Sequence, residues 1–289
     1  MEYAIDAINI TKKYKGFTLN QVSLRLPKGS IMGLIGENGA GKTTLIKLLL
    51  GLQHAEKAAG AGKEHASSIR LLNQDINTLP VSVREDIGVV LDDCCFPESL
   101  NLLQIEQILK NIYKNWDSAS FTHYAEYFNL PEKKLLKDYS KGMKMKLSIV
   151  AALSHQAKLL ILDEPTSGLD PVVRDEILDV FMDFIQEEDH SILISSHITS
   201  DLEKICDYVT FISEGHILLS DVKDDILSGY GLLKCSPQEL SLLDPTAIRG
   251  YKRTSFGVTA LVEREKVQGP FIIDPVNLED ILLYHVRGN

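Results

Sequence analysis

Apolar and polar residues alternate along the first thirty positions of the chain, with the period of two that is typical of β-strands. Two such segments run from Ala4 to Ile10 and from Phe17 to Leu26, and the second ends at the turn signal Pro27-Lys28-Gly29. Ser30 to Ile35 is a short apolar run that predicts a buried strand. After a glycine-rich loop, a helix is expected from Lys42 to Leu50. The chain therefore begins with an antiparallel β element and continues as a strand, a loop and a helix.

The period changes to that of a helix after Leu100. The apolar stripe that shows this change comprises Leu102, Leu103, Ile105, Ile108 and Leu109. Phe121 to Phe128 indicates a second helix, and a third begins near Lys141. We therefore expect an inserted α-helical subdomain at about residues 93–155.

Further strand and helix signals surround this insertion. The predicted strands are Ser68 to Leu72, Ile87 to Leu91, Leu159 to Leu162 and Ser191 to Ser195, and Val172 to Ile185 is an amphipathic helix. A short, continuously apolar strand is typical of the middle of a parallel sheet. Because strands and helices alternate around a helical insertion, the predicted fold class is α/β.

Two regions depart from this pattern. Gln53 to Ser68 is rich in Ala, Gly and Lys without a clear period, and a flexible surface loop is expected there. Near the end of the chain, Ala247 to Val262 alternates like strands, and Asn277 to Val286 is expected to form a terminal helix. We therefore divide the chain into residues 1–226 and a small α+β accessory region at residues 227–289.

Composition narrows the range of functions. The 289 residues include 44% hydrophobic and 24% charged residues, which is ordinary for a globular protein. A net charge of −10 argues against a nucleic-acid partner, because such proteins usually carry a basic face. No apolar run approaches the roughly 20 residues of a membrane-spanning helix, and the first residues lack the features of a signal peptide. The four cysteines, Cys94, Cys95, Cys206 and Cys235, lack the spacing of a zinc site and are expected to be reduced thiols of a cytoplasmic protein.

The glycine-rich loop carries the clearest chemical signal. Gly36 to Thr43 satisfies the pattern G-x-x-x-x-G-K-[ST] and lies between the predicted strand and helix. Glycines let backbone N–H groups converge on phosphate oxygens, Lys42 can neutralise phosphate charge, and the Thr43 hydroxyl can ligate Mg²⁺. The residues expected to contact nucleotide here are Gly36, Asn38, Gly39, Gly41, Lys42, Thr43 and Thr44. A second glycine-rich stretch, Gly60-Ala61-Gly62-Lys63, lacks a preceding strand and a following hydroxyl, so we interpret it as a solvated loop.

A pair of acidic residues follows a second buried strand. Asp163 and Glu164 come directly after Leu159 to Leu162, and a carboxylate at the end of such a strand lies beside the crevice where α/β proteins bind ligands. Asp163 is expected to hold Mg²⁺ together with Thr43, and Glu164 to accept a proton from the attacking water or to orient that water. The alternative, a simple turn before a helix, is less favourable once the phosphate-binding loop is present.

At this point the sequence resembles the ATP-binding-cassette (ABC) ATPases, through motifs that occur in order between about Glu2 and Ile226. Asp163 to Asp170 is similar to the Walker B and D-loop run of that family, and His197 matches its switch histidine. Tyr14 occupies the place of the aromatic residue that stacks on adenine. The remaining matched nucleotide-binding positions are Ser140 and Gly142 of the signature loop and Asp170 of the D-loop.

Two motifs depart from the family pattern, the signature loop at Lys141 and Met143 and the Q-loop at Asp92. The signature loop reads Tyr139-Ser140-Lys141-Gly142-Met143, which resembles the form found in exporter-type subunits that pair with separate membrane proteins. Asp92 stands where the family has the glutamine of its Q-loop. An aspartate can still ligate Mg²⁺, but it is shorter, charged and only accepts hydrogen bonds. Asp92 is therefore included among the expected metal ligands, with Thr43 and Asp163.

The resemblance implies a fold and an activity. The fold would be a P-loop NTPase core with an N-terminal antiparallel β element, an inserted helical subdomain and a small C-terminal α+β appendage. The chain would bind ATP and Mg²⁺, hydrolyse ATP with Glu164 and His197 as catalytic residues, and thereby drive transport, with export favoured over import. Its partners would be a polytopic membrane subunit and a second ATPase subunit, identical or different, at the inner face of the cell membrane.

Three other classes of function remain open at this stage. A soluble cassette ATPase acting on ribosomes or DNA usually has two cassettes, coiled-coil insertions or basic arms, and none is visible here. A regulatory subunit with a weakened site is suggested only by Asp92. A small-molecule kinase would leave the signature loop, the D-loop and His197 without a role.

Overall fold

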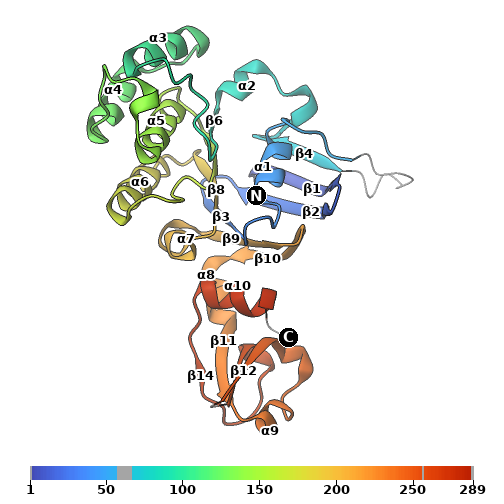
Figure 1. The fold of residues 1–289 in the computed structure, drawn as a ribbon. Coiled ribbons are helices and arrows are strands. Elements are labelled where there is room, and N and C mark those ends of the chain that lie inside the picture. The colour runs from blue at the N-terminus through green and yellow to red at the C-terminus, as the bar shows by residue number, and fades with distance from the viewer. Residues whose placement is uncertain (1, 57–66, 256, 288–289) are drawn as a thin grey trace.

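A six-stranded sheet forms the centre of the computed structural model, which describes residues 2–56, 67–255 and 257–287 (Figure 1). Its strand order is β10-β9-β3-β8-β7-β6. The bounds are Ile31–Ile35 for β3, Ile87–Val90 for β6, Leu159–Asp163 for β7, Ser191–Ser196 for β8, Tyr208–Ser213 for β9 and His216–Val222 for β10. All neighbours pair in parallel except β10, which runs antiparallel to β9. Because β3, β8 and β7 are adjacent and parallel, the loops that follow them lie at one edge of the sheet.

The N-terminal antiparallel element packs beside this sheet. Its strands follow the order β2-β1-β4-β5, with bounds Tyr3–Tyr14 for β1, Phe17–Pro27 for β2, Ser68–Leu71 for β4 and Gln74–Asp75 for β5. Inward-facing residues such as Ile5, Ile10 and Leu24 share a buried cluster with Met32 and with Leu45 of helix α1 (Lys42–Leu49). The alternating pattern of the first thirty residues therefore buries one face of this element. The predicted loop at 53–68 lies largely outside the described residues, as does the whole of Gly60-Ala61-Gly62-Lys63.

A group of helices covers the β6 side of the central sheet (Figure 1). Its members are α3 (Leu102–Ile112), α4 (Ser118–Tyr127) and α5 (Lys141–Leu153), and α5 contacts β6. The predicted stripe on α3 is only partly buried, because Leu103 and Ile108 are exposed. Successive helical residues are rotated by about 100°, so these two side chains flank the narrower face formed by Leu102, Ile105 and Leu109.

The remaining helices and turns connect these layers. The α-helices are α2 (Val81–Glu85), α6 (Pro171–Phe184), α7 (Thr199–Ile205), α8 (Lys223–Gly229) and α9 (Pro237–Leu240). Short 3₁₀ turns occur at Ile76–Thr78, Leu136–Asp138, Pro245–Ala247 and Arg264–Lys266. Helix α6 begins at Pro171, where the fixed backbone angle of proline suits a first helical position, and the Asp170 side chain caps it.

A third sheet and a terminal helix make up the C-terminal region. The strand order is β12-β13-β11-β14, with bounds Tyr230–Cys235 for β11, Ile248–Thr254 for β12, Gly257–Glu263 for β13 and Ile273–Asp274 for β14. One face of this sheet has its own small core, which includes Leu233 and Val262. Leu261, Leu278 and Ile281 instead join the main core, and helix α10 (Leu278–Arg287) lies between the third sheet and the rest of the molecule (Figure 1). The observed architecture is thus the mixed α/β fold predicted from the sequence, with an α+β appendage.

Candidate nucleotide-binding site

The loop from Gly36 to Thr43 connects β3 to α1 and is held close to the neighbouring backbone. A Cβ atom at Gly36 would lie 2.4 Å from the carbonyl oxygen of Ile212, so only glycine fits there without a shift of the backbone. Gly41 caps α1 with a φ of +114°, a conformation that side-chain-bearing residues rarely adopt. The glycines of the pattern are therefore required by the path of this loop.

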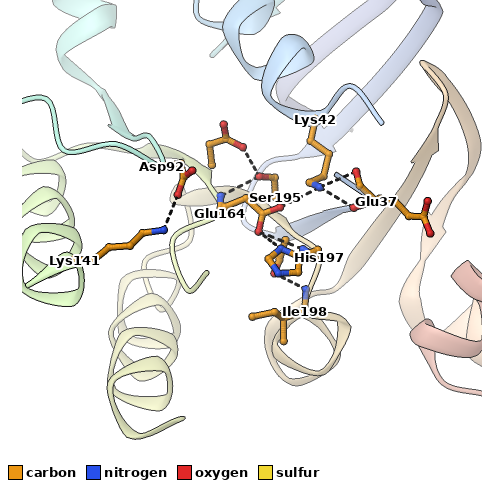
Figure 2. Close-up of polar contacts among 11 residues, drawn as sticks. Glu37, Lys42, Asp92, Lys141, Glu164, Ser195, His197 and Ile198 are labelled. Atoms are coloured by element: carbon orange, nitrogen blue, oxygen red, sulfur yellow. Dashed lines mark hydrogen bonds and ion pairs between the residues drawn. The ribbon is translucent and has the colours of Figure 1, made fainter. Parts of the chain in front are cut away.

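Lys42 is buried at the centre of the loop, with 5% of its surface exposed. Its ammonium group donates hydrogen bonds to the carbonyl oxygens of Gly36 at 2.7 Å and Glu37 at 3.3 Å. It also lies 3.0 Å from Oε1 of Glu164. Figure 2 shows the Lys42 side chain extending from α1 towards Glu164. A buried charge requires such partners, because an unpaired ammonium group in this environment would be strongly destabilising.

The acidic pair occupies the end of β7. Asp163 is 2% exposed, and its Oδ1 accepts a hydrogen bond of 2.6 Å from the hydroxyl of Ser195 on the adjacent strand β8. The backbone N–H of Glu164 donates to the same hydroxyl at 3.0 Å and to the carbonyl oxygen of Ser195 at 3.1 Å. Glu164 has a φ of +53°, in the left-handed region. The two carboxylates have different partners, because Asp163 contacts Ser195 whereas Glu164 contacts Lys42 and His197.

His197 completes a row of three side chains in contact. Its Nδ1 lies 2.7 Å from Oε2 of Glu164, and a carboxylate oxygen can only accept, so Nδ1 carries the proton in this contact. The His197 side chain is 40% exposed, whereas Lys42 is buried. Figure 2 shows Glu164 between these two residues. The structure thus brings together Lys42, Asp163, Glu164 and His197, as the sequence predicted, from three adjacent strands.

The hydroxyl residues at the start of α1 border this row. Thr43 is exposed at the first turn of the helix, and Thr44 is half-buried. Both follow Lys42 directly and share the end of the helix that presents unpaired backbone N–H groups. Their placement is compatible with a contact to phosphate and to a metal ion.

The signature loop lies at the beginning of α5, within the helical group that covers the β6 side of the central sheet. The Ser140 hydroxyl caps α5 by accepting from the N–H of Met143 at 3.2 Å, and Gly142 is in the first turn. Lys141 forms an ion pair of 3.3 Å with Asp92, and both side chains are more than half exposed. Asp92 thus contacts the signature loop, and among the described residues no contact joins it to Thr43 or Asp163.

Tyr14 and Asp170 have other partners in the structure. Tyr14 is 41% exposed at the end of β1 and stacks on Phe17 with ring centroids 6.4 Å apart, while its hydroxyl contacts Gln53. The Phe17 ring in turn lies against Gly41 of the loop. Oδ1 of Asp170 accepts from the N–H of Val173 at the start of α6. Tyr14 therefore borders the phosphate-binding loop through Phe17.

One residue in this site was missed by the sequence analysis. Ser195 is fully buried and contacts both acidic residues, although its strand was predicted only as an apolar element. The signal was available, because a pair of serines ends the otherwise apolar run Ile192 to Ile194. What the sequence could not supply was the register that sets Ser195 opposite Asp163.

Comparison with known proteins identifies the family. A sequence profile of the ABC transporter family matches residues 19–167. The bacitracin transport ATP-binding protein BcrA of Enterococcus faecalis is 34% identical over 221 residues, which span 75% of this chain and 69% of the relative. The chain belongs to the ABC transporter family.

Other ABC proteins extend this similarity. The lantibiotic transport ATP-binding protein SrtF of Streptococcus pyogenes is 35% identical over 75% of this chain and 90% of its own length. The uncharacterized ABC transporter ATP-binding protein YhcH of Bacillus subtilis (strain 168) is 27% identical over 99% of this chain and 92% of its own, so that match includes the C-terminal region.

Solved ABC structures agree with the fold. The structure of an ATP-binding subunit of an ABC transporter superposes with a TM-score of 0.67 and 25% identity, covering 78% of this chain and 92% of that one. A dimeric cassette bound to ADP and Pi has a TM-score of 0.65 and 18% identity, covering 75% of this chain and 98% of that one, which supports the fold alone. The chain is therefore an ABC ATP-binding subunit and an ATPase. Within the described residues, none of the helices is long and apolar enough to cross a bilayer.

Proposed function

We propose that this chain hydrolyses ATP at the site formed by Lys42, Asp163, Glu164 and His197, and that hydrolysis drives export through a separate membrane subunit. The observation that carries the proposal is the row in which Glu164 contacts Lys42 on one side and His197 on the other. This row aligns a cation for phosphate at the start of α1 with a carboxylate for water and an imidazole that follow the adjacent strands β7 and β8. Each of the three residues thus has a proposed role in the reaction.

The partners of Lys42 suggest how ATP binding and catalysis are linked. The Lys42 ammonium group donates hydrogen bonds to the backbone carbonyls of Gly36 and Glu37, and it forms an ion pair with Glu164. A phosphate oxygen would compete with Glu164 for this cation. Phosphate binding would therefore release the Glu164 carboxylate, which could then orient or deprotonate a water molecule while retaining its contact with His197.

The residues at the metal position fit Mg²⁺. Mg²⁺ prefers oxygen ligands and is commonly bound by one or two carboxylates together with substrate phosphates, so one buried aspartate and one hydroxyl suffice on the protein side. Asp163 and Thr43 supply these groups, and Mg²⁺ would neutralise charge on the phosphates there. Asp92 would first have to leave its ion pair with Lys141. We therefore propose Asp163 and Thr43 as the direct ligands and assign Asp92 a secondary role.

The remaining sites support a shared active centre. Ser140 and Gly142 lie at the beginning of α5. Among the described residues, no contact joins them to Lys42, Asp163, Glu164 or His197. We propose that they close the ATP site of a second ATPase subunit, which is either a copy of this chain or a different cassette. Tyr14 would stack on adenine, since an aromatic ring binds a base face without specific hydrogen bonds, and Asp170 would lie at the contact between subunits.

The direction of transport and the cell compartment rest on the relatives. The relatives named for bacitracin and lantibiotic transport support export by a complex with a polytopic membrane subunit. The chain would then act as a peripheral protein at the inner face of the cell membrane, where ATP is available. Co-purification with a polytopic membrane protein encoded beside it would support this assignment, and recovery with ribosomes or DNA would contradict it.

We also propose that residues 1–226 form the ATPase domain and residues 227–289 an accessory region that unfolds together with it. Leu261, Leu278 and Ile281 belong to the main core, and the N–H of Leu278 donates to Glu203 of α7 at 2.5 Å. Side chains of α10 also line a groove with Glu37 and His197. A single transition in urea is expected, whereas two separate transitions would show independent domains.

Two substitutions test the proposed site. Lys42→Ala should weaken ATP binding at least about tenfold, because a charge-assisted contact to phosphate is lost. Glu164→Gln should retain ATP binding but lower turnover at least about 100-fold, because the general base is lost. Lys47→Ala, on the same helix and only half-buried, is the matched control and should behave like the unsubstituted chain. Normal turnover in Glu164→Gln would overturn the assignment.

A further inference from the structure

Ser195 is a buried hydroxyl residue near the end of β8, beside the end of β7. It is the second-last residue of β8, has no exposed surface, and is paired in register with Asp163, the last residue of β7. In a parallel sheet, side chains of paired residues point to the same face, so the register places this hydroxyl beside the Asp163 carboxylate. The contact therefore follows from the sheet itself.

A single oxygen atom of Ser195 serves both acidic residues. Its hydroxyl donates to Oδ1 of Asp163 at 2.6 Å, and it accepts from the backbone N–H of Glu164 at 3.0 Å. The first bond occupies one carboxylate oxygen and restrains the orientation of the group. In the described parts of the chain, no hydrogen bond reaches Oδ2 of Asp163, which is thus the oxygen available to a metal ion.

The second bond acts on the backbone. Glu164 has a φ of +53°, which is unfavourable for a residue with a side chain, and its N–H is held by both the hydroxyl and the carbonyl oxygen of Ser195. Figure 2 shows Ser195 next to Glu164, with the Glu164 side chain directed between Lys42 and His197. The turn that aims this carboxylate is thus attached to β8.

We propose that Ser195 is a positioning residue that sets the orientation of the Asp163 carboxylate for the metal ion and of the Glu164 backbone for catalysis. The proposal rests on the roles proposed above for Asp163 and Glu164. It assigns Ser195 no contact with ATP. Its effect should therefore appear in metal affinity and in the catalytic step, and much less in the affinity for the nucleotide itself.

Ser191 offers a matched control on the same strand. Its hydroxyl is also fully buried and accepts one backbone N–H, that of Gly29 at 3.0 Å, but it lies at the opposite end of β8 from Asp163. Ser191→Ala removes the same atom from the same strand. Any general cost of deleting a buried hydroxyl should therefore be similar in Ser191→Ala and Ser195→Ala.

The experiment compares these variants in two ways. Steady-state ATP turnover should show kcat reduced about tenfold or more in Ser195→Ala, with little change in KM for ATP, while Ser191→Ala keeps its kcat. The Mg²⁺ concentration needed for half-maximal ATP binding, measured in a Glu164→Gln background that prevents hydrolysis, should rise about tenfold on adding Ser195→Ala. Ser195→Cys, which keeps the branching of the side chain with a somewhat larger atom and donates a weaker hydrogen bond, should be intermediate.

The possible outcomes separate this inference from the proposed function. If Asp163→Asn and Glu164→Gln lose turnover while Ser195→Ala matches Ser191→Ala in kcat and in Mg²⁺ dependence, the role of Ser195 is wrong and the site assignment stands. If Asp163→Asn or Glu164→Gln turns over normally, the site assignment itself fails. If Ser195→Ala is poorly folded, the Ser195→Cys variant decides: a kcat equal to that of the unsubstituted chain overturns the proposal.

Discussion

The phosphate-binding edge and the signature loop differ in how far each is completed within one chain. At the phosphate-binding edge, Lys42 and Asp163 are almost fully buried. Lys42 donates hydrogen bonds to carbonyl oxygens of its own loop, and Asp163 accepts one from Ser195 on the neighbouring strand β8. At the signature loop, Lys141 and Asp92 are more than half exposed and their main described contact is with each other. The first region is held in place by the core, whereas the second is presented to solvent.

This difference indicates which half of the reaction each region performs. A buried and internally bonded group is costly to displace, so the Lys42 edge is suited to hold phosphate and to position charge in every cycle. An exposed helix end with a serine cap can be covered or uncovered at little cost. We therefore interpret the signature loop as a surface that acts on another subunit.

The largest expected effect comes from Gly142→Glu, which tests the signature loop directly. The added carboxylate would repel phosphate at the beginning of α5, so turnover should fall on the order of 100-fold, while ATP binding at Lys42 is unchanged. Folding should not suffer, because acidic residues are favourable in the first turn of a helix. Gly142→Ala is the control, since its Cβ would make only an ordinary 3.4 Å contact with Leu169. Unchanged turnover in Gly142→Glu would show that the signature loop takes no part.

Two substitutions of Ser140 should separate the effect of its hydroxyl on stability from its effect on ATP turnover. Ser140→Ala removes the cap of α5 and should lower the free energy of unfolding by about 1 kcal/mol, whereas Ser140→Gly should cost only a few tenths. If the hydroxyl also contacts phosphate, both variants should lose the same fraction of ATP turnover. Urea unfolding and turnover assays measure the two effects. If Ser140→Gly keeps more turnover than Ser140→Ala, in parallel with its higher stability, the hydroxyl acts only as a helix cap.

The opposite end of α5 should give the protein a stability that depends on pH. Burial lowers the pKa of His155 below its ordinary value of 6.5, and its Nδ1 donates to the carbonyl oxygen of Glu85 at 2.8 Å. The folded state therefore keeps this histidine neutral, and the unfolded state takes up a proton as the pH falls below about 6.5. The free energy of unfolding should decrease from pH 7.5 to pH 5.5. His155→Phe, which retains stacking on Tyr113, should reduce that slope, and an unchanged slope would contradict this account.

The smallest effect is expected for the Asp92–Lys141 ion pair. A double-mutant cycle with Asp92→Ala and Lys141→Ala should give a coupling energy of about 0.5 kcal/mol or less, because exposed ion pairs are screened by water and salt. The measurement is the free energy of unfolding of the four proteins. A coupling energy several times larger would show that the signature loop is held as firmly as the Lys42 edge, which would contradict the difference between the two regions.

The same contrast between regions explains what the sequence could predict. The loop from Gly36 to Thr43 is recognisable because its glycines are required by geometry, and β3, β7 and β8 are recognisable because buried parallel strands are continuously apolar. These features are local. The fold class and the grouping of Lys42 with Glu164 follow from them.

Other features depend on contacts between distant residues. The Asp92–Lys141 pair joins side chains 49 positions apart, and nothing local marks either as a partner of the other. The role of Ser195 depends on the register between β7 and β8. Strands β9 and β10 were not predicted, although Tyr208–Ser213 is a largely apolar run and Gly215 after it is a turn signal. Leu261 and Leu278 pack on the main core only because α10 folds back onto α7.

Sedimentation velocity of the Glu164→Gln variant with ATP and Mg²⁺ tests most directly whether the two regions form one site between two chains. We expect a monomer without nucleotide and a dimer at saturating ATP, and we expect that adding Gly142→Glu prevents the dimer while ATP still binds. A Glu164→Gln chain that is saturated with ATP and remains a monomer at high protein concentration would contradict it.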